Sequence, residues 1–145
     1  MLADFGLQFD HFGLATRSAP HSLAFVQGLG YRCDPVVHDP LQGVNLVWCE
    51  HRAMPAVELI YAAAESGPLD AILAQQPQAV YHLCYRSFSV RASLDAMKAA
   101  GQRVLTVSAP KAAVLFGGLE VSFYMVRGFG LIEIIESPAT GEAAT

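Results

Sequence analysis

The sequence predicts an α+β fold built from two tandem βαβββ modules. Three kinds of position recur in both halves of the chain at the same or nearly the same interval: His11 and His82, Gly30 and Gly101, and Glu58 and Glu133. Recurrence at a fixed interval is the sequence signature of an internal repeat. Each copy reads as a strand with a histidine, a helix that ends at glycine, and three strands, the last of which carries a glutamate.

Length and composition fit one domain with a substantial core. The chain has 145 residues, of which 53% are hydrophobic and 15% are charged, whereas disordered chains are poor in apolar residues. We therefore expect a single domain over residues 1–145. Within it, module one should span residues 9–62, a linker helix residues 66–77, and module two residues 79–136.

The elements of module one follow from local patterns. Alternation in the run FDHFGLAT predicts a strand with His11 in its middle. Ser18 as N-cap and Pro20 in the first turn predict a helix, which Gly28 or Gly30 should end. Breaker residues in HDPLQG predict a turn. The three remaining strands are expected at residues 31–37, 44–50 and 56–62.

The linker and module two show similar signals. Ser66 and Pro68 predict the start of the linker helix, and Pro77 its end. In module two, the run AVYHLCYR predicts the strand with His82, and Ser89 caps the helix that follows. Strands are then expected near residues 103–107, 120–126 and 131–136. A long loop, residues 108–118, should lie between the first two of these strands.

Four residues are candidate metal ligands: His11, Glu58, His82 and Glu133. Each lies among apolar residues in a predicted strand, where an unpaired carboxylate costs several kcal/mol. Taken singly, such a histidine is more often an ordinary hydrogen-bonded residue, and such a glutamate can face solvent. Repeat-equivalent placement instead favours one shared divalent ion. Imidazole and carboxylate ligands suit Zn, Co, Ni, Mn or Fe.

Four further residues are candidates for contact with a substrate. Gln42 lies in the HDPLQG turn, and Lys111 lies in the expected loop at the rim of a pocket. Phe116 and Phe123 are candidates for its wall. Each can also be explained without a substrate, because turn residues, exposed cations and core aromatic residues are common in proteins where they contact no ligand.

Charge and cysteine content exclude several classes of partner. The formal net charge is -4 and the nine basic residues are scattered, so we expect no nucleic-acid surface. No apolar run approaches the ~20 residues needed to cross a bilayer, so we expect no membrane segment. The three cysteines have no CxxC spacing. We expect them to be thiols in a reducing compartment, with the cytoplasm as the default.

The order of these motifs resembles that of the vicinal-oxygen-chelate superfamily, which includes glyoxalase I, extradiol dioxygenases and bleomycin-resistance proteins. The motifs that carry the resemblance are FDHFGLAT, HDPLQGV, VELIYA, VYHLCYR and VSFYMVRGFGLIEIIE. Within the superfamily, their order is most similar to that of methylmalonyl-CoA epimerase. The resemblance implies a glyoxalase-like fold, in which the two modules form a curved, cupped mixed sheet. It also implies a homodimer.

Carried over position by position, the resemblance implies a metal held by His11, Glu58, His82 and Glu133. It implies a metal-dependent isomerase that moves a proton next to a carbonyl of an acyl-thioester or another carbonyl compound. Glu133 is the expected catalytic base, with Glu58 as the second candidate. One departure is Leu46, which stands where some epimerases place a second catalytic carboxylate.

Three alternative functions resemble other members of the superfamily. The first is a glyoxalase I-type lactoylglutathione lyase, in which a glutamate at the place of Glu58 occurs in some members. The second is a non-catalytic protein that binds a small molecule, as bleomycin-resistance proteins do. The third is an extradiol-type dioxygenase, because two histidines and a carboxylate resemble the iron triad of that class.

Overall fold

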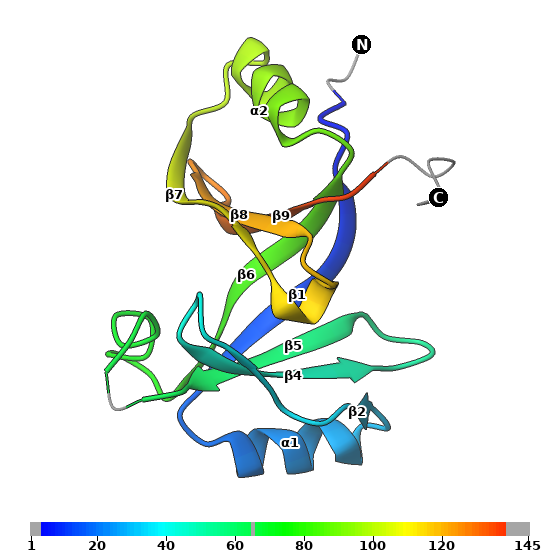
Figure 1. Cartoon of the computed structure of the whole chain (residues 1–145), viewed down its shortest axis with the longest axis vertical. Coiled ribbons are helices and arrows are strands. Elements are labelled where there is room, and N and C mark those ends of the chain that lie inside the picture. The colour runs from blue at the N-terminus through cyan, green and yellow to red at the C-terminus, as the bar shows by residue number, and fades with distance from the viewer. Residues whose placement is uncertain (1–3, 65, 139–145) are drawn as a thin grey trace.

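In the part of the chain that the structure describes, nine strands form one mixed sheet, and its central pair of strands joins the two halves (Figure 1). The computed structural model describes residues 4–64 and 66–138. The first half contains β1 (Gln8–Thr16), α1 (Ala19–Gly28), β2 (Arg32–Cys33), β3 (Val37–Asp39), β4 (Val44–Glu50) and β5 (Ala56–Ala62). The second half contains β6 (Gln78–Ser87), α2 (Val90–Ala99), β7 (Val104–Ala112), a 3-10 turn η1 (Val114–Phe116), β8 (Glu120–Val126) and β9 (Gly130–Glu136).

The two halves repeat the same pairing pattern. The strand order is β2-β4-β5-β1-β6-β9-β8-β7, and β3 pairs with β4 outside this path. In each half, the first strand runs parallel to the last: β1 pairs with β5, and β6 pairs with β9. The antiparallel pair β1 and β6 then connects the halves. The predicted α+β fold with two βαβββ units in one open, curved sheet is confirmed.

The two helices lie at opposite ends of the molecule (Figure 1) and pack on the same face of the sheet. Val26 of α1 packs against residues of β4 and β5, and Met97 of α2 packs against residues of β8 and β9. Ser89 caps α2 as predicted, since its Oγ accepts a hydrogen bond from the Ala92 N–H at 3.2 Å. Ser18 precedes α1 but makes no such bond with its side chain.

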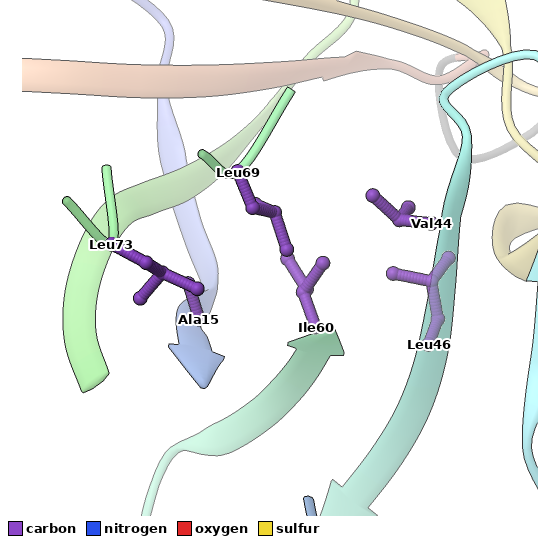
Figure 2. Close-up of a cluster of buried hydrophobic side chains, with 6 residues drawn as sticks. All are labelled: Ala15, Val44, Leu46, Ile60, Leu69 and Leu73. Atoms are coloured by element: carbon purple, nitrogen blue, oxygen red, sulfur yellow. The ribbon is translucent and has the colours of Figure 1, made fainter. Parts of the chain in front are cut away.

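The other face of the sheet carries two apolar clusters. The first comprises Ala15, Val44, Leu46, Ile60, Leu69 and Leu73 (Figure 2). The second comprises Cys84, Ala113, Val121 and Ile135. Because side chains two apart on a strand share a face, Ile60 and Ile135 place these clusters on the same face as Glu58 and Glu133. Buried apolar side chains therefore flank the four candidate ligands.

Strands β4, β5 and β8 have the predicted boundaries, but the expected strand at residues 31–37 is interrupted. It forms two short strands, β2 and β3, on either side of Pro35. Proline has no N–H to donate to a strand ladder, so it ends regular pairing at this position.

The expected loop at residues 108–118 is also shorter than predicted, because β7 continues to Ala112. Its pairing with β8 shifts between Thr106 and Ser108 and again between Ser108 and Lys111. Pro110 is tolerated there because β7 is the edge strand of the sheet. The sequence pattern missed this strand because Ser108, Pro110 and Lys111 all read as loop residues.

The expected linker helix at residues 66–77 is a run of turns rather than a helix. Leu69 and Leu73 form a single helical turn, in which the Leu73 N–H donates to the Leu69 carbonyl at 2.9 Å, and both side chains are buried. Gly67 and Pro77 limit the segment to a length at which an isolated helix is marginal. The described helices, α1 and α2, have ten residues each, and neither is long and apolar enough to span a membrane.

Candidate metal centre

The four candidate ligands come from the four central strands of the sheet. In sheet order, β5 carries Glu58, β1 carries His11, β6 carries His82 and β9 carries Glu133. One potential ligand atom from each of the four side chains lies within 4.8 Å of all the others. All four are buried, with exposed fractions between 0 and 3%. We call this group the His/Glu quartet.

Two nitrogen atoms and two oxygen atoms face one another in the quartet. His11 Nε2 lies 3.6 Å from Glu58 Oε2 and 3.5 Å from Glu133 Oε1. His82 Nε2 also lies 3.5 Å from Glu133 Oε1. These separations are longer than ordinary hydrogen bonds. They leave the ligand atoms arranged around a common point.

Several buried atoms of the quartet lack hydrogen-bond partners within the part of the chain that the structure describes. They are His11 Nε2, both ring nitrogens of His82, and Glu133 Oε1. Buried polar atoms without partners are rare in folded proteins because each costs on the order of 1–3 kcal/mol. A divalent cation would satisfy imidazole nitrogen and carboxylate oxygen together. The residues present therefore fit a bound metal ion.

The backbone of β1 makes room for His82. Gly13 is the direct cross-strand partner of His82 in the antiparallel pair β1 and β6. A Cβ atom built at position 13 would overlap the imidazole ring of His82, at Cε1 and at both nitrogens. Gly13 is thus required for the position that the His82 ring adopts.

A second layer of polar groups orients His11. Its Nδ1 lies 2.7 Å from Asp10 Oδ2, and Asp10 Oδ1 in turn accepts a hydrogen bond from Arg86 Nε at 2.7 Å. With Nδ1–H donating to the carboxylate, His11 Nε2 faces Glu58 and Glu133, and its lone pair becomes available to a metal ion when Nε2 loses its proton. This is the carboxylate–histidine arrangement that commonly supports metal-binding histidines.

The environment shifts the pKa values of three members in the metal-free protein. Burial raises the pKa of Glu58 to about 8, and the nearby Glu133 charge adds to the effect. Burial also acts to raise the pKa of Glu133, but the adjacent His11 and His82 rings outweigh it and lower the pKa to about 2. Burial acts to lower the pKa of His11, but Asp10 and the two glutamates raise it to about 9.

Aromatic rings surround the two histidines. Phe116 stacks on His11 with ring centroids 5.5 Å apart, and Trp48 meets the same ring edge-on at 4.9 Å. Phe123 lies edge-on to His82 at 5.4 Å. A cavity of about 350 Å³ borders Trp48 and Phe116 and is also lined by Arg86. The rings that touch His11 thus form one wall of a cavity large enough for part of a small molecule.

Of two predicted substrate contacts, Gln42 has another visible role and Lys111 is exposed. Gln42 Nε2 donates to Asp39 Oδ2 at 3.1 Å, and the Gln42 N–H donates to Asp39 Oδ1, so this residue closes the turn before β4. Lys111 is exposed on β7 opposite Val121. A substrate role for Gln42 or Lys111 stays a prediction.

The sequence did not reveal the roles of Asp10, Gly13 and Arg86. Neighbouring residues on a regular strand point to opposite faces, so a regular strand would not bring the Asp10 side chain to His11. The pairing of β1 with β6 shifts between Phe9 and His11, and an irregularity of this kind can re-aim a side chain. An acidic residue directly before a candidate ligand, with arginine on the adjacent strand, was the available signal.

Comparison with known proteins agrees with this fold. Residues 10–123 match the model of the glyoxalase/bleomycin resistance protein/dioxygenase superfamily. This range contains His11, Glu58 and His82, whereas Glu133 lies beyond it. No curated protein sequence matched the chain.

Several solved structures share the fold at low sequence identity. Methylmalonyl-CoA epimerase from Mycobacterium tuberculosis is 19% identical, with a TM-score of 0.74, and the match covers 96% of this chain and 93% of that one. A hypothetical protein from Bacillus halodurans is 22% identical, with a TM-score of 0.76 and coverages of 94% and 99%. A Streptomyces coelicolor methylmalonyl-CoA epimerase in complex with 2-nitronate-propionyl-CoA is 20% identical, with a TM-score of 0.70 and coverages of 91% and 98%.

At these identities the structural matches establish the fold, and the family model, which spans most of the chain, establishes the relationship. The predicted superfamily is therefore confirmed. The chain belongs to the glyoxalase/bleomycin resistance protein/dioxygenase superfamily.

Proposed function

We propose that this protein is a metal-dependent isomerase that moves a proton at the carbon next to a carbonyl of an acyl-thioester. One observation carries the proposal. Two histidines and two glutamates are buried together, and one potential ligand atom of each lies within 4.8 Å of the other three. The resemblance to methylmalonyl-CoA epimerases in fold supports the substrate class.

The quartet would hold one divalent ion, which we propose to be Zn, Co, Ni, Mn or Fe. When bound, such an ion supplies Lewis-acid stabilisation of the negative charge that develops on a carbonyl oxygen as the adjacent carbon loses its proton. His11 and His82 would hold the ion from neighbouring strands. Asp10 would keep His11 oriented, because it accepts the Nδ1 proton and is itself held by Arg86.

Glu133 is the proposed proton-transfer group. The adjacent imidazoles of His11 and His82 favour its ionised form, and a carboxylate must be ionised to accept a proton. Its strand also places it beside Phe123, whose ring touches His82. Glu58 is the second candidate, because its carboxyl group lies in the same buried space.

Leu46 leaves β4 without a proton-accepting group at the position where some epimerases are expected to carry a second catalytic carboxylate. This residue is 3% exposed and packs among Ala15, Val44 and Ile60, opposite Ile60 on β5. An apolar side chain cannot accept or return a proton there. An epimerisation by this protein would therefore return the proton from a ligand of the quartet or from water.

Proton exchange tests the proposal directly. Purified protein loaded with Zn²⁺, Co²⁺, Ni²⁺, Mn²⁺ or Fe²⁺ in separate samples is incubated in D₂O with methylmalonyl-CoA, and deuterium at the α-carbon is followed by mass spectrometry. We expect exchange with at least one ion. Glu133→Gln should reduce the rate by at least about 100-fold, as loss of a general base typically does.

The matched control is Glu120→Gln, which changes an exposed carboxylate on the neighbouring strand β8 and should leave exchange unchanged. Absence of exchange with every ion, in samples shown to contain bound metal, would rule out this reaction for methylmalonyl-CoA.

Leu46 also favours a second candidate function, that of a binding protein which sequesters a small molecule and performs no chemistry. Such a protein has no need of a metal ion. Metal analysis after gentle purification separates the two, because the enzyme should carry close to one ion per chain. A cytoplasmic homodimer, expected from the sequence and the resemblance, stays a prediction.

A further inference from the structure

Two of the three cysteines face each other at the edge of the sheet. Cys33 of β2 is the direct partner of Cys49 in the antiparallel pair with β4. The Asp34 N–H donates to the Trp48 carbonyl at 2.8 Å, so the adjacent pair of residues 33 and 49 occupies a non-hydrogen-bonded position. Side chains of antiparallel strands approach most closely at such positions, where the Cα atoms lie about 4.5 Å apart.

The two sulfur atoms are already in contact. Both thiols are free, and the Sγ atoms of Cys33 and Cys49 are 2.7 Å apart. Disulfides accept Cα separations of roughly 4.4–6.8 Å, so this strand pair can form the bond with little backbone movement. Cys84, in contrast, lies on β6 within a different apolar cluster.

We propose that Cys33 and Cys49 are a redox-active pair that forms a reversible disulfide by exchange with a low-molecular-weight disulfide such as glutathione disulfide. Cys33, as its thiolate, attacks one sulfur of the small disulfide, which breaks that S–S bond and releases one thiol. The Cys49 sulfur then loses its proton and attacks Cys33 Sγ, which forms the protein disulfide and releases the second thiol.

The different exposure of the two cysteines indicates which of them reacts first. Cys33 is half-buried at the sheet edge, whereas Cys49 is fully buried beneath α1. Burial raises the pKa of the Cys49 thiol, so it is a poor first nucleophile. Cys49 reacts only after Cys33 has been oxidised to the mixed disulfide at contact distance.

The bond would link a short edge strand of the first module to β4 covalently. β2 has only two residues in the sheet and lies at its edge, where it pairs with β4 alone. A disulfide between residues 33 and 49 closes a loop that restricts the unfolded chain. Trp48 and Cys49 point to opposite faces of β4. The disulfide would therefore form on the other side of the sheet from the Trp48 ring that contacts His11.

The test uses the full-length protein, which is equilibrated under native conditions with glutathione disulfide, then denatured, alkylated and weighed intact. We expect loss of two hydrogens and one alkylated cysteine instead of three. Peptide mapping should link Cys33 to Cys49 and find the alkyl group on Cys84. The oxidised protein should melt about 5 °C or more above the reduced protein.

Two variants provide matched controls. In Cys49→Ala, Cys33 should be trapped as the mixed disulfide with glutathione. In Cys33→Ser, neither a protein disulfide nor the gain in melting temperature should appear. Three alkylated cysteines in the wild-type protein after equilibration with glutathione disulfide, or a link that includes Cys84, would overturn the proposal. Neither result needs a variant to fold. Both outcomes are independent of metal content and of catalysis, so they leave the proposed function untouched.

Discussion

Gly13 and His82 face each other across the central strand pair, and the imidazole ring fills the space that a Cβ atom on residue 13 would need. The relationship links the backbone of β1 to the position of a candidate metal ligand on β6. It also explains why a glycine occupies the middle of a buried strand, where its lack of a side chain otherwise weakens packing.

Gly13→Ala is expected to displace the His82 ring and to lower the affinity for Zn²⁺ or Co²⁺ by at least about 10-fold. Isothermal titration calorimetry measures the change. The control is Gly28→Ala in α1, since a Cβ atom there meets nothing within 4 Å and both the affinity and the fold should persist. Wild-type affinity in Gly13→Ala would contradict a ligand role for His82 in its present position.

Asp10→Asn is expected to weaken metal binding about 10–100-fold, because the carboxylate that orients His11 through Nδ1 is replaced by a neutral amide. The visible spectrum of the Co²⁺ protein should change as well, since it responds to ligand geometry. Asp95→Asn, on the exposed side of α2, serves as the control. Identical Co²⁺ spectra and affinities in Asp10→Asn and wild type would show that Asp10 does not position His11.

The metal-free protein is expected to lose stability as the pH rises from 6.5 to about 9. His11 has a pKa of about 9 and Glu58 one of about 8 in the folded protein, both above their ordinary values. The folded state therefore holds more protons than the unfolded state in this range, and a rising pH favours unfolding. Thermal melting in the presence of a chelator measures the effect.

Two comparisons sharpen this pH experiment. Glu58→Gln should flatten the slope between pH 4.5 and about 8, because the group whose pKa is raised has been removed. Added Zn²⁺ should reverse the trend, since metal binding requires deprotonated ligands and strengthens as the pH rises. A melting temperature that rises with pH in the metal-free wild type would exclude the protonation states assigned to His11 and Glu58.

Leu46→Ala is expected to lower the free energy of unfolding by about 2–5 kcal/mol, because it opens a cavity among buried side chains on the quartet face. Chemical denaturation measures the loss. Leu41→Ala is the matched control, since Leu41 is 58% exposed and its truncation should change stability by no more than about 0.5 kcal/mol. Equal effects of the two substitutions would mean that Leu46 is not a packed core residue.

Much of the fold could be predicted from the sequence, because the patterns that indicate its strands and helices are local or occur in both halves. Alternation and breaker residues placed β4, β5 and β8 at their observed ends, and Ser89 marked the start of α2. The linker segment shows the limit of such signals. Ser66, Pro68 and Pro77 marked a helix, but the segment is too short for a helix that is stable in isolation. It forms turns, in which Leu69 and Leu73 pack against residues of β1, β4 and β5.

The sequence by itself determined the repeat, and with it the four positions of the His/Glu quartet, because chemically similar residues recur at nearly the same interval along the chain. Only the tertiary structure decided what supports them. The contact of Asp10 with His11, its bond to Arg86 on β6 and the close approach of Gly13 to His82 all depend on the register of two antiparallel strands. Register follows from the hydrophobic patterns of both strands and from the connection between them. Because β1 and β6 lie far apart in the sequence, the pattern of neither strand alone fixes it.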